Sequence, residues 1–160
     1  MPQAQEVQRL RREPVGYPEE HFPGEEEAAP AWLARWLRAR LEELGGDPQD
    51  ALVLCIGTDR STGDALGPLV GTLLVEMGLQ DAGGRPAILS GPGPWVCGTL
   101  ERPVHAANLQ QTLREVGGRH PRSFVVAVDA CLGRAEHVGH ITAGRGPLRP
   151  GAGVNKDLPP

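Results

Sequence analysis

Residues 51–57 read Ala51-Leu-Val-Leu-Cys-Ile-Gly57, and nearly every one of them is apolar. A strand covered on both faces of a parallel sheet has this composition, whereas a strand with one face in water alternates apolar and polar residues. The run therefore predicts a central parallel strand. A polar loop over residues 58–63 follows it, and residues 64–77 have the composition of a helix, with Pro68 in its first turn and Gly78 at its end.

The order strand, loop, helix repeats along the rest of the chain. The predicted elements are, in order, a short strand over 87–90, a helix over 104–116, a second fully apolar strand over 123–130, a strand that includes 138–142, and an irregular Gly- and Pro-rich loop over 144–160. Alternating strands and helices imply a parallel sheet with helices on its faces. We therefore predict an α/β fold with a mostly parallel central sheet.

Two regions precede the first predicted strand. Residues 1–30 are rich in glutamate and proline and poor in apolar residues, which predicts an acidic tail that is disordered or loosely docked. Residues 31–44 place Trp32, Trp36 and four leucines on one face at helical spacing. An amphipathic helix must bury such a stripe, so we interpret the tryptophans as packing anchors rather than a ligand cage. At 160 residues the chain has room for one domain, which we place at 31–160.

Charge and composition exclude several classes of function. The net charge is −4 and no basic run is interleaved with aromatic residues, so a nucleic-acid partner is not expected. The amino terminus lacks the apolar core of a signal peptide, and no apolar span reaches membrane length. The three cysteines are widely spaced, as in a reducing compartment, and we expect Cys131 to lie in apolar packing. We predict a cytoplasmic protein with no membrane partner and no cofactor.

The loop between the first strand and its helix, residues 57–68, reads GTDRSTGDALGP and concentrates carboxylates, hydroxyls and a guanidinium. In open α/β sheets, ligands bind beyond the carboxyl ends of the strands, where such loops gather. The loop lacks the Gly-Lys-Ser/Thr ending of a Walker loop and the Gly-x-Gly-x-x-Gly spacing of a dinucleotide fingerprint. Phosphate binding by its backbone amides stays open as an alternative.

Two aspartates, one in the loop after the first predicted strand and one at the end of the second fully apolar strand, are the candidate active carboxylates. Asp64 stands at or just before the first turn of the predicted helix, where its alternative role is an N-cap that accepts backbone N–H bonds. Asp129 closes the apolar run 124–128, where a buried charge without a partner costs several kcal/mol. Two carboxylates that converge from adjacent strand ends repel each other. One pKa then rises, so that the pair shares a proton and can activate water.

Other polar residues are weaker candidates. His105 opens the second predicted helix and could reach the site, although a histidine there is more often a surface or packing residue. Arg60 and Arg134 could hold a carboxylate or a substrate backbone, or be ordinary surface charges. His137 and His140 lie three residues apart on a presumed strand, so we expect them on opposite faces and not around one metal ion.

Four runs of this sequence resemble the YyaC sporulation protein family. They are CIGTDRSTGDALGPLVG at 55–71, GTLERPVHAANL at 98–109, VDACLGR at 128–134 and GPLRPGAGVNKDLPP at 146–160. The resemblance spans residues 51–160 and implies the three-layer phosphorylase/hydrolase-like α/β fold shared by the spore germination protease and the hydrogenase maturation proteases. Family members continue past residues 157–160 with another strand and helix, so we expect the chain to be truncated at its carboxyl end.

The resemblance also implies a function. The germination protease, which degrades small acid-soluble spore proteins, carries a similar Asp-Ala-Leu-Gly-Pro segment and a similar strand ending in Asp-Ala, and Asp64 and Asp129 fall on its two aspartates. A sporulation-associated peptidase of the forespore or mother cell follows, in which these aspartates activate water against a peptide carbonyl. The residues expected to orient the substrate or the developing oxyanion are Thr58, Asp59, Arg60, Ser61, His105 and Arg134.

Two alternatives remain beside the peptidase. One is a non-catalytic sporulation factor that binds a peptide or protein through the same loops. The other is a metal-dependent peptidase of the maturation type, although no histidine here clearly occupies the later position that supplies a ligand in those enzymes, and we expect no bound metal. Fold resemblance alone does not choose among the three.

Overall fold

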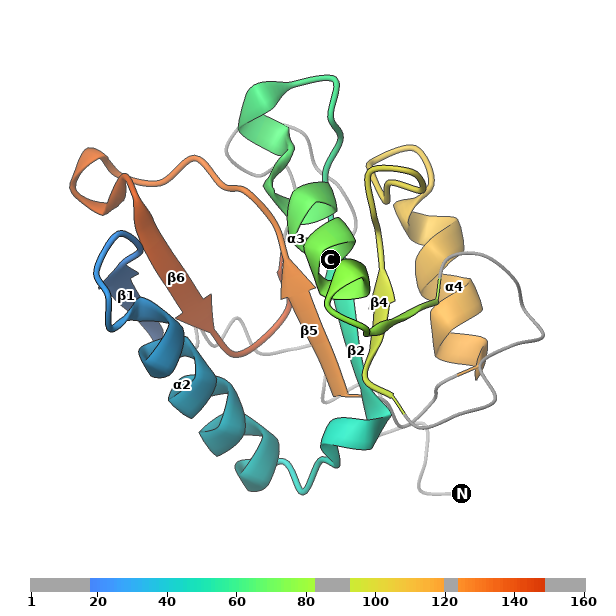
Figure 1. The fold of residues 1–160 in the computed structure, drawn as a ribbon, viewed down its shortest axis with the longest axis horizontal. Coiled ribbons are helices and arrows are strands. Elements are labelled where there is room, and N and C mark those ends of the chain that lie inside the picture. Colours follow the sequence, from blue (N-terminus) through green and yellow to red (C-terminus); the bar gives the residue numbers. More distant parts are fainter. Residues whose placement is uncertain (1–17, 83–92, 120–123, 149–160) are drawn as a thin grey trace, which may run out of the picture.

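The computed structural model of the chain describes residues 18–82, 93–119 and 124–148 (Figure 1). Its strands are β1 (Glu19–Pro23), β2 (Ala51–Cys55), β3 (Gln80–Asp81), β4 (Trp95–Cys97), β5 (Phe124–Val128) and β6 (His140–Gly144). Its helices are α2 (Ala29–Glu43), α3 (Leu66–Glu76) and α4 (Leu109–Arg119). The strands form two sheets, one of four strands and one of two.

The larger sheet is parallel, in the order β3-β4-β2-β5. Strand β2 is interior, with Leu52 opposite Trp95 of β4 on one side and Val125 of β5 on the other. The predicted central parallel strand is therefore confirmed, and so is the α/β fold class. Because the strands are parallel, their carboxyl ends meet at one edge of the sheet, to which the arrows of β4 and β5 point in Figure 1.

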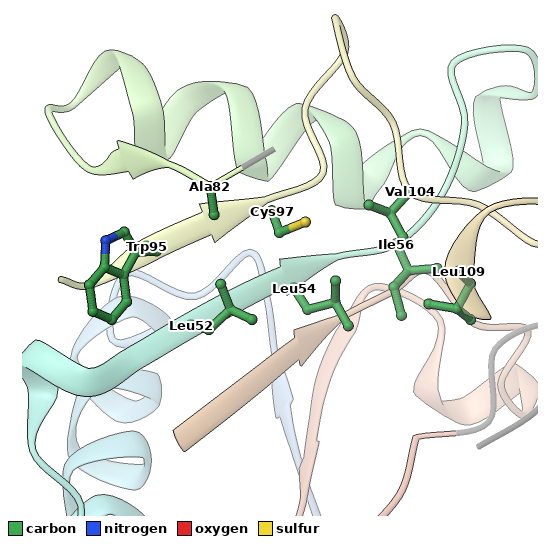
Figure 2. Packing of buried hydrophobic residues seen from close by; sticks show 8 residues of the cluster. All are labelled: Leu52, Leu54, Ile56, Ala82, Trp95, Cys97, Val104 and Leu109. Carbon is green, nitrogen blue, oxygen red and sulfur yellow. The ribbon is translucent and has the colours of Figure 1, made fainter. Parts of the chain in front are cut away.

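Alternate side chains of β2 point to opposite faces of the sheet. Leu52, Leu54 and Ile56 lie on one face, in a buried cluster with Val104 and with Leu109 of α4 (Figure 2). Each such leucine, fully buried, contributes roughly 1.5–3 kcal/mol of transfer free energy. Helix α3 covers the other face, where Cys55 meets its backbone. The sheet is thus the middle of three layers.

Helix α3 lies close to the sheet because two of its residues at the contact are glycines. A Cβ on Gly67 would stand 2.0 Å from the carbonyl oxygen of Ile56, and a Cβ on Gly71 would stand 1.9 Å from that of Gly98. No side chain fits in either space. The start of α3, and the loop that leads into it, are therefore held against the carboxyl end of β2.

Residues 18–30 were predicted to be part of a disordered or loosely docked tail, but they contribute to the smaller sheet and to α2. Strand β1 pairs antiparallel with β6, in the register His21 opposite Thr142, so this part of the predicted tail is ordered. Phe22 stacks on Trp32 of α2 at 5.1 Å, and the Trp36 Nε1–H donates to Glu20 Oε1 at 3.0 Å. Both tryptophans are packing residues, as predicted. Residues 1–17 lie outside the described residues.

Several predicted boundaries differ from the structure. The helix predicted from 104 begins at Leu109, because Val104 forms a parallel bridge with Ile56 and residues 106–108 make a turn. Strands β3 and β4 were not predicted, and the strand predicted over 87–90 lies outside the described residues. The strand predicted around 138–142 is β6, which belongs to the smaller sheet. Of the predicted α2 stripe, Leu44 is exposed, because the helix ends before it.

Candidate functional site

Three segments of chain leave the sheet side by side at its carboxyl edge. The Ile56 N–H donates to the carbonyl oxygen of Val128 at 2.8 Å, and the Gly57 N–H donates to that of Val104 at 2.8 Å. Ile56 is also bridged to Val104, and the two side chains lie next to each other in Figure 2. By this register, Asp129 follows Val128 level with Ile56 on one side of the chain, and His105 follows Val104 level with Gly57 on the other.

The loop after β2 folds back over this edge. The Thr58 N–H donates to the carbonyl oxygen of Asp64, and the Asp64 N–H donates to that of Ser61, both at 2.9 Å. Gly57 has a φ of 144°, and a Cβ there would stand 2.1 Å from the Asp64 carbonyl oxygen. Only glycine allows this conformation and this approach. The backbone of Asp64 consequently rests directly on Gly57, beside the end of β5.

Asp129 responds electrostatically to Asp64. Burial of the Asp129 carboxyl and the negative charge of Asp64 together raise its pKa to about 6, against the effect of a hydrogen bond from the Ala130 N–H. A carboxylate acts on another in this way only at short range in a partly dry site. The structure thus brings together the two aspartates that the sequence singled out.

The alternative interpretation of Asp64 as the N-cap of α3 is wrong. The N-cap residue is Ala65, whose side chain makes no cap hydrogen bond. Asp64 instead ends the short 3₁₀ turn Thr62–Asp64. Its carboxylate is therefore not committed to capping the helix behind it.

The remaining loop residues line the same edge with more exposure. Thr58 is half-buried, and its Oγ1 accepts the Arg60 N–H at 3.3 Å, which tightens the turn. Asp59, Arg60 and Ser61 are exposed.

Arg134 is placed differently from the loop residues. Its guanidinium Nη1 lies 3.7 Å from Glu136 Oε1, with the two side chains 81% and 62% exposed. An exposed pair of this kind contributes roughly 0–1 kcal/mol to stability. The structure therefore shows Arg134 in a surface ion pair, and among the described residues it has no ion pair with either aspartate.

His137 and His140 were expected on opposite faces of one strand, and this prediction is wrong. His137 belongs to the 3₁₀ helix Ala135–His137 that precedes β6. Its ring stacks on His21 of β1 at 3.8 Å and meets the His140 ring edge-on at 5.8 Å. Sequence reasoning missed His21, because its partner strand is distant in the chain. Within the described ranges, no three histidine, cysteine or acidic side chains are arranged to hold a metal ion.

The cysteines give one correction. Cys131 is exposed, not buried, because the chain leaves the sheet just after β5. Cys55 and Cys97 are buried, and burial raises the pKa of the Cys55 thiol to about 12, with a smaller effect of Cys97. A thiol with so high a pKa is a poor nucleophile.

Among the helices that the structure describes, none combines the length and apolar composition needed to cross a bilayer.

Comparison with known proteins identifies relatives. The family described as "Protein of unknown function (DUF1256)" matches residues 24–160. "Uncharacterized protein YyaC" of Bacillus subtilis (strain 168) is 46% identical over 132 residues, which cover 82% of this chain and 58% of that relative. The chain thus spans little more than half the length of this relative, and the resemblance to YyaC is confirmed. No solved structure matches the chain.

Proposed function

The chain belongs to the DUF1256 family, and from the site it carries we propose that it is a peptide hydrolase in which Asp64 and Asp129 activate water. The observation that carries the proposal is the electrostatic coupling of these carboxyls at the carboxyl edge of the sheet, with the pKa of Asp129 raised to about 6. Two carboxyls whose surroundings separate their pKa values can divide the roles of acid and base between them.

The roles follow from which carboxyl holds the proton. Asp129 has the raised pKa, so it is the acid that donates a proton to the carbonyl oxygen of the scissile peptide. Asp64 is the base that takes a proton from water while the water oxygen bonds to the carbonyl carbon. Collapse of the resulting diol breaks the C–N bond, and the departing nitrogen receives a proton as the carboxyls return to their starting state.

The loop around Asp64 supports this assignment. Its backbone is fixed by hydrogen bonds from Thr58 and to Ser61, so Asp64 is held in place before a substrate arrives. Groups fixed in advance do not have to reorganise when charge develops in the transition state. The exposed side chains of Asp59, Arg60 and Ser61 border the approach and would orient the peptide.

The wider biology of the proposal rests on the sequence resemblance. By their resemblance in local sequence, Asp64 and Asp129 fall on the two aspartates of the germination protease, whose substrates are small acid-soluble spore proteins. We therefore propose spore proteins as the first substrates to test and the cytoplasm of the forespore or mother cell as the location. A chain that retains the fold but only binds peptides would carry the same loops and would show no turnover.

A cleavage assay with three variants tests the proposal. Purified protein is incubated at pH 5, 6 and 7 with small acid-soluble spore proteins and with a pool of capped synthetic peptides, and products are identified by mass spectrometry. Wild type is expected to cleave, while Asp64→Asn and Asp129→Asn each lose at least about 100-fold in rate, within the contribution of a general acid or base.

Glu76→Gln is the matched control, because Glu76 is an exposed carboxylate at the end of α3 away from Asp64 and has no role in the proposed site, and it should keep most of the activity. Equal inertness of wild type and all variants at every pH would exclude hydrolysis of these substrates. Equal cleavage by wild type and Asp129→Asn would point to a contaminating protease.

A further inference from the structure

His105 occupies the flank of the site opposite Asp129. It follows Val104, which is bridged to Ile56 on one side of β2, whereas Asp129 follows Val128 on the other side. Neighbouring strands in a sheet are about 4.8 Å apart, so the backbones of His105 and Asp129 are separated by two spacings, about 10 Å. The loop of Asp64 lies between them.

The hydrogen bonds around His105 determine which ring nitrogen carries the proton. The Ala107 N–H donates to His105 Nδ1 at 3.3 Å. A backbone N–H can only donate, so Nδ1 is the acceptor, and the neutral imidazole carries its proton on Nε2. Within the described residues, no hydrogen-bond partner of Nε2 is found. The ring therefore presents one N–H donor to which the described part of the chain supplies no acceptor.

Asn108 fixes the segment that carries this ring. Its Oδ1 accepts the His105 N–H at 2.8 Å, and its Nδ2 donates to the carbonyl oxygen of Pro103 at 2.9 Å. The Leu109 N–H also donates to the carbonyl oxygen of His105 at 2.8 Å, at the start of α4. The backbone on both sides of His105 is thus bound, and Asn108 is a positioning residue for it.

We propose that His105 Nε2–H binds a backbone carbonyl of an extended peptide about three residues from the bond that is cleaved. The spacing follows from geometry, because an extended chain advances about 3.3 Å per residue and three residues span the separation of about 10 Å from Asp129. The inference rests on the proposed function, since it takes the peptide to be the ligand. It adds a subsite that selects for peptide length and extended conformation.

Nitrogen-15 NMR of the histidine rings tests the donor directly, without any turnover. In wild type, the shifts of the neutral His105 ring are expected to show Nε2 protonated and Nδ1 bare. Asn108→Asp keeps the Oδ1 acceptor but loses the donor to Pro103, and it should weaken this preference. A wild-type ring protonated on Nδ1 would overturn the inference whatever the protein cleaves.

Kinetics then test the role, using a peptide that wild type cleaves. His105→Leu is expected to raise KM about five- to tenfold with kcat nearly unchanged, as for the loss of one hydrogen bond made equally in the ground and transition states. His105→Gln, whose amide can donate from a position near Nε2, should recover most of the loss. Peptides too short to reach His105 should show no difference between wild type and His105→Leu.

The outcomes separate this inference from the proposed function. If wild type cleaves and His105→Leu leaves KM unchanged while still folded, the His105 subsite is wrong and the hydrolase stands. If wild type is inert but the peptide pool shifts the Nε2 resonance of His105, the subsite stands and the protein binds without cleaving. If wild type is inert and the resonance does not move, both are wrong.

Discussion

The backbone carbonyl of Asp64 accepts the N–H of Thr58 at 2.9 Å, so the loop after β2 closes on itself over the end of the sheet. This bond explains how a residue in a polar connector comes to lie beside Asp129, which ends a separate strand. It requires glycine at 57, because any Cβ there would collide with the same carbonyl oxygen. The placement of one candidate carboxylate is thus a property of the backbone, not of its own side chain.

Removal of one carboxylate should change the ionisation of the other. Asp64→Asn takes away the negative charge that helps to raise the pKa of Asp129, so this pKa should fall from about 6 towards the ordinary range while burial keeps it from falling fully. Carbon-13 NMR of the aspartate carboxyls over a pH titration measures the change. Asp59→Asn, in the same loop, should leave the Asp129 titration where it is in wild type.

The same raised pKa should make the free energy of unfolding depend on pH. Asp129 titrates near 6 in the folded chain and near 4 when unfolded, so the folded state binds more protons between these values. Its contribution to stability is fully present below pH 4 and is lost as pH rises through 6. Urea unfolding at pH 4, 5, 6 and 7 should show a smaller loss over this window in Asp129→Asn. Identical curves would mean that Asp129 titrates alike in both states.

How far the sequence predicts this fold depends on how local the determining signal is. Strands β2 and β5 are five-residue apolar runs, so both were predicted from local sequence. Parallel strands end at one edge of a sheet, which is why the acidic residues beyond them could be singled out as candidates. Strand β4 has only three residues, too few for a periodic pattern. Strand β1 is an acidic segment that becomes a strand only through pairing with β6, far along the chain, which no local pattern records.

The effect of a glycine in α3 on stability is also not predictable from local sequence, because it depends on a distant backbone contact. In most helix interiors, replacing glycine by alanine stabilises a protein by up to about 1 kcal/mol. Gly71→Ala should instead destabilise by about 2 kcal/mol or more, since its Cβ would stand 1.9 Å from the Gly98 carbonyl oxygen and the helix would have to move off the sheet. Gly118→Ala in α4 is the control, because a Cβ at Gly118 has no neighbour within 4 Å among the described residues, and it should be neutral or stabilising. Urea unfolding of both variants decides the point.

Two leucines that both lie in apolar runs should differ widely in the loss of stability that follows their replacement by alanine. Leu52 of β2 has no exposed surface and belongs to the central cluster, whereas Leu73 of α3 is 56% exposed. Leu52→Ala removes buried atoms and leaves a cavity, so it should cost about 2–5 kcal/mol. Leu73→Ala loses little buried area and should change stability by less than about 1 kcal/mol. If chemical unfolding showed Leu73→Ala to be as costly as Leu52→Ala, α3 would have to be covered in solution by something that the described residues do not supply.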